Sequence, residues 1–217
     1  MVDLSKSGGG RGPRVLVIGE TSGVISRAFA AAGADVATCD LHPSVSHDLP
    51  PFIGDFTYIC DLGWDLVIGH PPCIYLANSG VQYVTSEEDR LDRVKEVAAV
   101  FLRMHASKAP FVAIEQPIVH RYAREFLHQL RPTQYVRPWQ HGTGHQKTTG
   151  LYLSAGLPAL TPSCEVPGRL RAMANLPAGP QRGDRRSRTY IGIAGAMAVQ
   201  WMPVLLQHLA SLPTTST

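Results

Sequence analysis

The residues best suited to chemistry stand directly after short apolar runs. The segment HPPC (70–73) follows LVIG, and Glu115 follows FVAI and precedes a Gln-Pro pair. Two successive prolines fix two φ angles and end strand pairing, so Cys73 is expected to be held rigidly. A positioned thiol can act as a nucleophile when a nearby cation lowers its pKa from about 8.5, and a carboxyl group with a raised pKa can donate a proton to a ring nitrogen. Taken singly, a cysteine is more often a structural core residue, and an acid at a strand end is as often merely solvated.

A second polar group lies in the turn GETSG (19–23), after the run VLVI, and at Asp40, after the run VATC. Two glycines let the backbone approach a ligand at the start of a helix, and an acid at the end of the next strand can accept hydrogen bonds from ribose hydroxyls. Because Glu20 would repel a pyrophosphate and attract an amino group, the turn favours S-adenosylmethionine over a dinucleotide. Asp55 is a candidate for contact with adenine. The glycines alone could equally serve only the geometry of the turn.

These residues need a scaffold that brings the ends of several strands together. Apolar and β-branched runs predict strands at 14–19, 34–40, 64–70, 110–117 and 149–157, and helical spacing predicts helices at 24–33, 87–104 and 191–212. Strands that alternate with helices indicate an α/β fold with a doubly wound, mostly parallel sheet. Ligands of such sheets bind at the carboxyl ends of the strands, where the candidate residues cluster.

The composition fits one domain of this kind. The chain has 217 residues, of which 44% are hydrophobic, enough for a single core. No uninterrupted apolar run approaches about 18 residues, so no transmembrane helix is expected. Four cysteines without a C-x-x-C pair argue against a zinc site and against disulfides. Residues 1–13 and 213–217 are expected to be flexible tails around a single domain at 14–212, and the absence of an apolar leader predicts a cytoplasmic protein.

Charge divides the chain into two unlike halves. Residues 1–110 carry 9 Lys and Arg against 13 Asp and Glu, whereas residues 111–217 carry 11 against 4. The basic half is suited to a polyanion, although a merely soluble basic surface has the same composition. Within it, the segment 158–188 is rich in Pro, Gly and Arg and shows little periodicity.

Five segments, in this order along the chain, resemble the motifs of the cytosine-C5 DNA methyltransferases, most closely the short phage-encoded type. They are GETSG with Asp40, WDLVIGHPPCIYLANSG, AIEQP, HGTGHQKTTGLYLSAGLP and RSRTYIGIAGAMAVQW, and together they cover nearly all of residues 14–202. The resemblance implies a Rossmann-like class I methyltransferase fold, with S-adenosylmethionine as cofactor and DNA as partner. It also implies a bacterial or phage-infected host cell, with neither a metal nor a membrane involved.

The resemblance also implies roles for individual residues. In that family a cysteine thiolate attacks C6 of a cytosine flipped out of the DNA, a glutamate hydrogen-bonds the base at N3, and C5 then takes the methyl group. By motif, Cys73 is the expected nucleophile and Glu115 the expected N3 partner. The residues expected at the cofactor are Gly19, Glu20, Ser22, Gly23, Asp40, Asp55 and Pro71. The residues expected at the substrate are Asn78, Ser79, Lys147, Arg169, Arg185, Arg186 and Arg188.

The sequence departs from the family pattern in three places. Gln116 stands where the family has Asn, and QKTT (146–149) replaces a Gln-x-Arg-x-Arg element, which leaves Lys147 as the one cation there. The segment 158–188 takes the place of a long recognition domain, and so short an insert predicts brief recognition dominated by phosphate contacts. Two other functions stay open: a catalytically silent DNA-binding module, and an enzyme that modifies C5 of free deoxycytidine nucleotides or uses a related cofactor.

Overall fold

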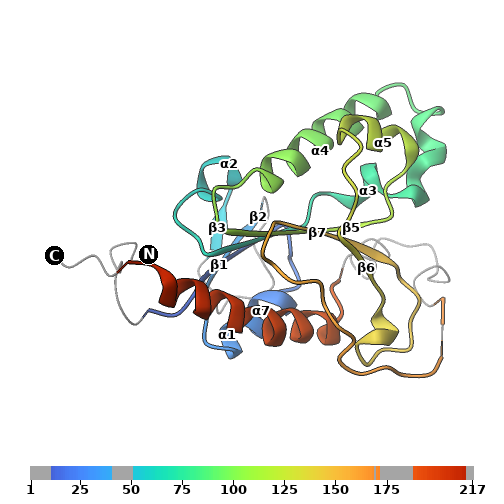
Figure 1. The fold of residues 1–217 in the computed structure, drawn as a ribbon. Helices are drawn as coiled ribbons and strands as arrows, with labels where there is room; N and C mark the ends of the chain where they lie inside the picture. The colour runs from blue at the N-terminus through green and yellow to red at the C-terminus, as the bar shows by residue number, and fades with distance from the viewer. Residues whose placement is uncertain (1–10, 41–50, 169, 172–187, 214–217) are drawn as a thin grey trace.

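A computed structural model describes residues 11–40, 51–168, 170–171 and 188–213 of the chain. Within them, seven strands form one sheet in the order β3-β2-β1-β4-β5-β7-β6 (Figure 1). The strands are β1 (Arg14–Ile18), β2 (Asp35–Asp40), β3 (Pro51–Ile53), β4 (Leu66–Gly69), β5 (Phe111–Pro117), β6 (Gln134–Val136) and β7 (Thr149–Leu153). Neighbours are parallel except that β7 runs antiparallel to β5 and β6. The predicted α/β fold with a doubly wound, mostly parallel sheet is confirmed.

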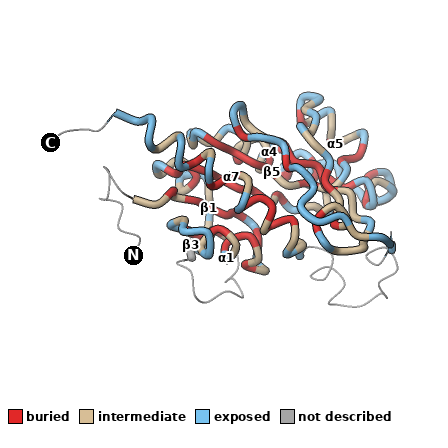
Figure 2. Tube along the Cα trace, turned by 60° about the horizontal axis from the view of Figure 1, so that its bottom comes forward, coloured by how far each residue is buried: buried red, intermediate tan, exposed pale blue. Residues whose placement is uncertain are grey.

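The central strands are apolar throughout because both faces of the sheet are covered. All of β4 is buried, and β1 is buried from Val15 to Ile18 (Figure 2). A strand with one solvated face would alternate apolar and polar residues, whereas these runs do not. Parallel neighbours also need a crossover, and helices α1 (Val24–Ala31) and α4 (Arg90–His105) supply two of them.

Two helical layers enclose the sheet (Figure 1). On one face, α1 packs against the long helix α7 (Ile191–Ser211), with the rings of Phe29 and Trp201 6.5 Å apart. The opposite face carries α4 together with the shorter helices α2 (Phe56–Ile59), α3 (Cys73–Leu76) and α5 (Arg121–Phe126). The sheet therefore separates two apolar cores, and its carboxyl edge stays open between the layers.

Helix α7 is long and apolar enough to cross a membrane by length and composition, the one such helix among the described residues. Its inward side chains are core residues, including Ile193, Met197, Trp201 and Leu205, which are buried against the sheet and α1. A helix that fills a core has the same composition as a membrane span. The packing of α7 therefore accounts for its apolar sequence.

The prediction of a flexible tail over residues 1–13 is wrong for its last three residues. The Arg11 guanidinium binds the Asp65 carboxylate through two hydrogen bonds of 2.6 and 3.0 Å, and the Pro13 carbonyl accepts a hydrogen bond of 2.9 Å from the Asp35 N–H. Asp65 is 3% exposed, so this charge is paired within the fold. Residues 11–13 therefore extend the edge of β1 and belong to the domain.

The described part of the segment 158–188 also packs on the domain. Trp201 donates its indole N–H to the Pro158 carbonyl at 2.9 Å. The Gln134 side-chain amide bonds both the N–H and the carbonyl of Leu160, at 2.8 and 2.5 Å. These contacts fix the start of the segment between β6 and α7. Arg169, Arg185 and Arg186, predicted to bind substrate, lie outside the described residues.

Candidate active site

The loop after β1 and the segment after β4 touch at the carboxyl edge of the sheet. Gly19 has φ +74°, and a Cβ atom there would lie 2.4 Å from the carbonyl oxygen of His70. The His70 N–H donates to the Ile18 carbonyl at 2.8 Å, which continues the pairing of β1 with β4 by one residue. Glycine is therefore required at position 19 both for its backbone conformation and for the close approach of the two loops.

Glu20 is buried in the turn that leads into α1. Its carboxylate accepts hydrogen bonds from the Ser22 hydroxyl and from the N–H groups of Val24, at 3.2 Å, and Ile25, at 3.3 Å. These N–H groups belong to the first turn of α1, where no preceding carbonyl can accept them. Glu20 thus caps α1 from the turn itself, and Gly23, at φ 65°, allows the chain to enter the helix. The expected contact of Glu20 with a cofactor amino group stays a prediction.

Asp40 and Asp55 lie at the carboxyl ends of β2 and β3. The Asp40 carbonyl accepts a hydrogen bond of 3.0 Å from the Gly54 N–H, which brings the two strand ends together. Asp55 caps α2 by accepting a hydrogen bond of 2.8 Å from the Thr57 N–H, and this bond lowers the pKa of its carboxyl group. Both acids are at the edge expected for a bound nucleoside, and their roles at a cofactor remain predictions.

The candidate nucleophile Cys73 begins the short helix α3, whose backbone is anchored from two sides. Arg90 donates to the Ile74 carbonyl at 2.7 Å and lies over the Tyr75 ring. His120 donates from Nε2 to the Tyr75 carbonyl at 2.8 Å. Two consecutive carbonyls of this single turn are therefore held by side chains from α4 and from the start of α5, which fixes the segment that carries Cys73.

The thiols differ in their surroundings. Burial raises the pKa of Cys39 to about 11 and also raises the pKa of Cys60, so both stay protonated near neutral pH. Cys73 is partly exposed and Cys164 is exposed, and none of the four forms a disulfide. Of the two accessible thiols, Cys73 lies in the pocket described next.

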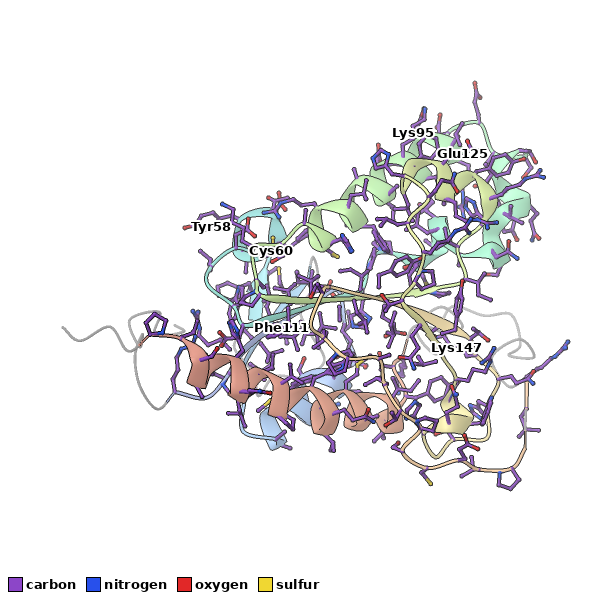
Figure 3. All side chains as sticks on the ribbon, in the orientation of Figure 1. Tyr58, Cys60, Lys95, Phe111, Glu125 and Lys147 are labelled. Carbon is purple, nitrogen blue, oxygen red and sulfur yellow. The ribbon has the colours of Figure 1, made fainter. Side chains whose placement is uncertain are left out.

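One pocket lies at the carboxyl ends of β1, β4 and β5, and it contains both candidate catalytic residues. The residues that line it are Gly19, Glu20, Thr21, Ser22, His70, Pro71, Pro72, Cys73, Glu115, Gln116, Pro117, Lys147 and Arg188. Segments almost 100 residues apart in sequence, from the turn at Gly19 to Glu115, thus meet at one place. Figure 3 shows Lys147 at the end of the sheet opposite to Phe111, the first residue of β5.

Glu115 contacts His70, a residue to which the sequence analysis gave no role. His70 Nδ1 lies 3.1 Å from Glu115 Oε2, and the Thr189 hydroxyl lies 3.5 Å from the same oxygen. Burial would raise the pKa of Glu115, but the bond and charge of His70, together with Lys147, outweigh it and lower that pKa. Burial would likewise lower the pKa of His70, but Glu115 and then Glu20 raise it. The two shifts favour a protonated imidazole beside a carboxylate, so the raised pKa expected for the Glu115 carboxyl group is not found.

The parallel register of β4 and β5 could have revealed this pair. Gly69 is opposite Ile114, so the next residues along each strand, His70 and Glu115, are neighbours on the same face of the sheet. The pairing of strands was not part of the sequence prediction. Thr189 could not have been found in this way because it comes from the approach to α7, 74 residues further along the chain.

Two residues expected at the substrate, Asn78 and Ser79, do not line this pocket. Both are exposed on the 3-10 helix Asn78–Val84, and Asn78 lines a separate groove beside the end of β5, with Ile118, Arg124, Arg131 and Tyr135. Among the residues that the structure describes, neither arginine of this groove makes an ion pair. Pro117, the last residue of β5, lines the pocket, and Ile118, the next residue of the chain, lines the groove.

Comparisons with protein families and with curated proteins find no match to this chain. Among solved structures, it is similar to a protein described as a proposed DNA modification methyltransferase encoded within an Escherichia coli prophage, at 15% identity and a TM-score of 0.47 over 76% of this chain. The alignment spans 55% of that protein, so this chain matches about half of its length.

Two further similar structures are also described as methyltransferases. A TehB-like S-adenosylmethionine-dependent methyltransferase from Corynebacterium glutamicum has 16% identity and a TM-score of 0.34, over 66% of this chain and 81% of that one. An rRNA methylase from E. coli has 16% identity and a TM-score of 0.37, over 64% and 55%. At these identities and TM-scores the likeness says nothing of the role of this chain, and its fold is described by its own strands: an α/β fold with a mixed, mostly parallel seven-stranded sheet.

Proposed function

We propose that this chain transfers a methyl group from S-adenosylmethionine to C5 of cytosine in DNA, through a covalent bond between Cys73 and the base. The observation that carries the proposal is the single pocket lined by Cys73, by Glu115 and by the turn after β1. The expected nucleophile, the expected acid and the turn expected to hold the cofactor lie far apart in the sequence. In the fold they line the same pocket. A pocket at the carboxyl ends of parallel strands is where such a sheet binds its ligands.

The turn after β1 suits S-adenosylmethionine. Its positive-φ glycine brings backbone to the edge of the pocket, and Glu20 gives the pocket wall a carboxylate. That carboxylate disfavours a pyrophosphate and favours a cationic amino group or sulfonium. Asp40 and Asp55, at the next two strand ends, would serve the ribose and adenine. When bound there, S-adenosylmethionine supplies the methyl group.

The residues of the pocket account for the remaining chemistry. The Cys73 thiolate adds to C6 of the cytosine and forms a carbon–sulfur bond, while the displaced electron pair is taken up at N3 with a proton from Glu115. C5 becomes nucleophilic and accepts the methyl group. Loss of the C5 proton to a water molecule then breaks the carbon–sulfur bond, restores the thiolate and returns the N3 proton to Glu115. Lys147, near the Glu115 and His70 side chains, provides positive charge at the same pocket.

The basic groove beside the pocket supports DNA as the substrate. A base can enter the pocket only after it leaves the stack, which costs a few kcal/mol that backbone contacts must offset. Arg124 and Arg131 supply guanidinium groups for phosphates, and the Tyr135 ring, 46% exposed, offers a stacking surface. Arg188, at the pocket itself, adds a third arginine.

The test is to incubate the protein with methyl-tritiated S-adenosylmethionine and DNA, RNA or dCMP in parallel. We expect label in DNA, recovered as 5-methyldeoxycytidine. Label in dCMP alone would indicate a nucleotide-modifying enzyme, and DNA binding without any label would indicate a silent binding module; either result would contradict the proposal. Cys73→Ala should abolish transfer, whereas Cys164→Ser, which removes the other accessible thiol, serves as the matched control.

A further inference from the structure

His70 and Glu115 are held face to face by the sheet itself. Because β4 and β5 pair in parallel with Gly69 opposite Ile114, the following residues share one face, and Nδ1 of His70 reaches Oε2 of Glu115 at 3.1 Å. The two side chains are only 13% and 12% exposed. A buried hydrogen bond between ionisable groups is stronger than one in water and is costly to break on one side only.

Both contacts of the Glu115 carboxylate fall on the same oxygen. His70 and the Thr189 hydroxyl meet Oε2, and within the described part of the chain no hydrogen bond reaches Oε1. Glu115 also lines the pocket. The carboxylate is therefore oriented, with one oxygen committed to its neighbours and the other available to a ligand.

The second ring nitrogen of His70 faces no proton acceptor among the described residues. Nε2 is buried and has no hydrogen-bond partner among the described residues. A proton on the imidazole can therefore move along one route, from Nδ1 to Glu115. The charged groups that face the pair are Glu20 from the turn after β1, which favours the protonated ring, and Lys147 from the segment before β7, which opposes it.

We propose that His70 is a positioning residue that orients Glu115 and stores the proton that Glu115 passes to N3 of the target base. This inference rests on the proposed function. When the Cys73 thiolate adds to C6, the Nδ1 proton of His70 passes to the Glu115 carboxylate, and the carboxyl group so formed gives that proton to N3. The imidazolium becomes neutral imidazole and the carboxylate keeps its charge. When the carbon–sulfur bond breaks after methylation, the C5 proton leaves to water and the N3 proton returns through Glu115 to His70.

The stored proton predicts a particular pH dependence. Because His70 has a raised pKa, the imidazolium is complete at low pH and is lost as the pH rises through that pKa. The rate of adduct formation should therefore decrease as the pH rises through the pKa of His70, which gives an alkaline step in the pH profile.

The experiment measures covalent trapping on random-sequence DNA in which 5-fluorodeoxycytidine replaces deoxycytidine, at a series of pH values. The fluorine at C5 cannot leave as a proton does, so the protein stays bound to the base. His70→Asn keeps an N–H near the position of Nδ1 but cannot store a proton. We expect trapping at neutral pH to slow by about tenfold or more and the alkaline step to disappear.

The matched control is His141→Asn, because His141 is also buried and bonds a neighbour, Ser163, through Nδ1 at 3.0 Å. It should keep the wild-type pH profile. If His70→Asn traps DNA at the wild-type rate with the wild-type alkaline step, His70 is only a structural hydrogen-bond donor and the inference is overturned.

A second measurement does not depend on turnover. In ¹⁵N-histidine-labelled protein, the His70 ring should titrate above its ordinary pKa of 6.5, and Glu115→Gln should lower that pKa. A His70 titration that Glu115→Gln leaves unchanged would overturn the inference even if DNA is methylated. Conversely, a wild type that traps no DNA while the two residues still titrate together would overturn the proposed function. The proton stored on His70 would then have no target base to receive it.

Discussion

The backbone of Gly19 approaches the carbonyl oxygen of His70 so closely that a Cβ atom at Gly19 would lie 2.4 Å from it. This approach joins the turn expected to hold the cofactor to the segment that carries Cys73. A side chain at position 19 would have to push the two apart. The distance between this turn and the segment that carries Cys73 is therefore set by the missing Cβ atom at position 19.

Gly19→Ala should weaken binding of S-adenosylmethionine and lower the free energy of unfolding, the latter by at least about 1 to 2 kcal/mol for the positive φ alone. Gly33→Ala is the matched control because Gly33 also has a positive φ, +92°, but has nothing within 4 Å of its missing Cβ. It should lower stability and leave cofactor affinity unchanged. Calorimetric titration and urea unfolding measure the two quantities, and equal cofactor affinities for the two variants would contradict this role of Gly19.

The His70–Glu115 ion pair should contribute to stability only within a limited pH range. The pKa of His70 is raised above 6.5, so its contribution is complete below that pH and is lost as the pH rises through the raised value. The pKa of Glu115 is lowered below 4.5, so its contribution is complete above that pH and is lost as the pH falls through the lowered value. A double-mutant cycle of His70→Asn and Glu115→Gln should give a larger coupling energy at about pH 5.5 than at about pH 9. A coupling energy that does not change with pH would show that the two groups carry no opposite charges.

Arg124 and Arg131 should act on DNA through phosphates. Replacing either with Ala is expected to weaken binding similarly for all sequences and to reduce the slope of log affinity against log salt concentration by about 1. Lys108→Ala is the control because this substitution also removes one positive charge. Lys108 is exposed and lies near the opposite end of β5. An unchanged salt slope in both arginine variants would rule out phosphate contacts in this groove.

Gln116 should destabilise the fold. Its side chain is fully buried, and neither amide atom has a hydrogen-bond partner within the described residues. Gln116→Met keeps the shape and removes both polar groups, so the free energy of unfolding should rise by about 1 kcal/mol or more. Gln134→Met is the opposite case because the Gln134 amide bonds Leu160 twice, and it should lose stability. A loss of stability in Gln116→Met as well would mean that its amide is hydrogen-bonded.

The sheet could be predicted from the sequence where strands are long and wholly apolar. The runs that became β1, β2, β4, β5 and β7 lie within two faces of packed helices, and their patterns have no competing interpretation. Strands β3 and β6 have three residues each and were not predicted, because a segment so short carries no periodicity and depends on the neighbour it pairs with. The predicted strand at 149–157 ends at Leu153, since the chain turns there away from β5.

The candidate site could be predicted in part for the same reason. Glu20 and Cys73 follow β1 and β4, and Glu115 lies near the end of β5, so the order of these strands brings all three to one pocket. Asn78 was predicted at the substrate from its motif, but it lies on a separate 3-10 helix that lines the adjoining groove. The anchoring of α3 by Arg90 and His120 depends on packing between distant helices, to which no sequence pattern points.

The most direct test of the proposed chemistry is to identify the residue that bonds to the base. Wild-type protein is incubated with S-adenosylmethionine and 5-fluorodeoxycytidine DNA, digested with trypsin and nuclease, and analysed by mass spectrometry. We expect one modified peptide, in which Cys73 carries a methylated fluorocytosine nucleotide. Methylated DNA without any such peptide, or a bond to Cys164, would contradict the proposed mechanism.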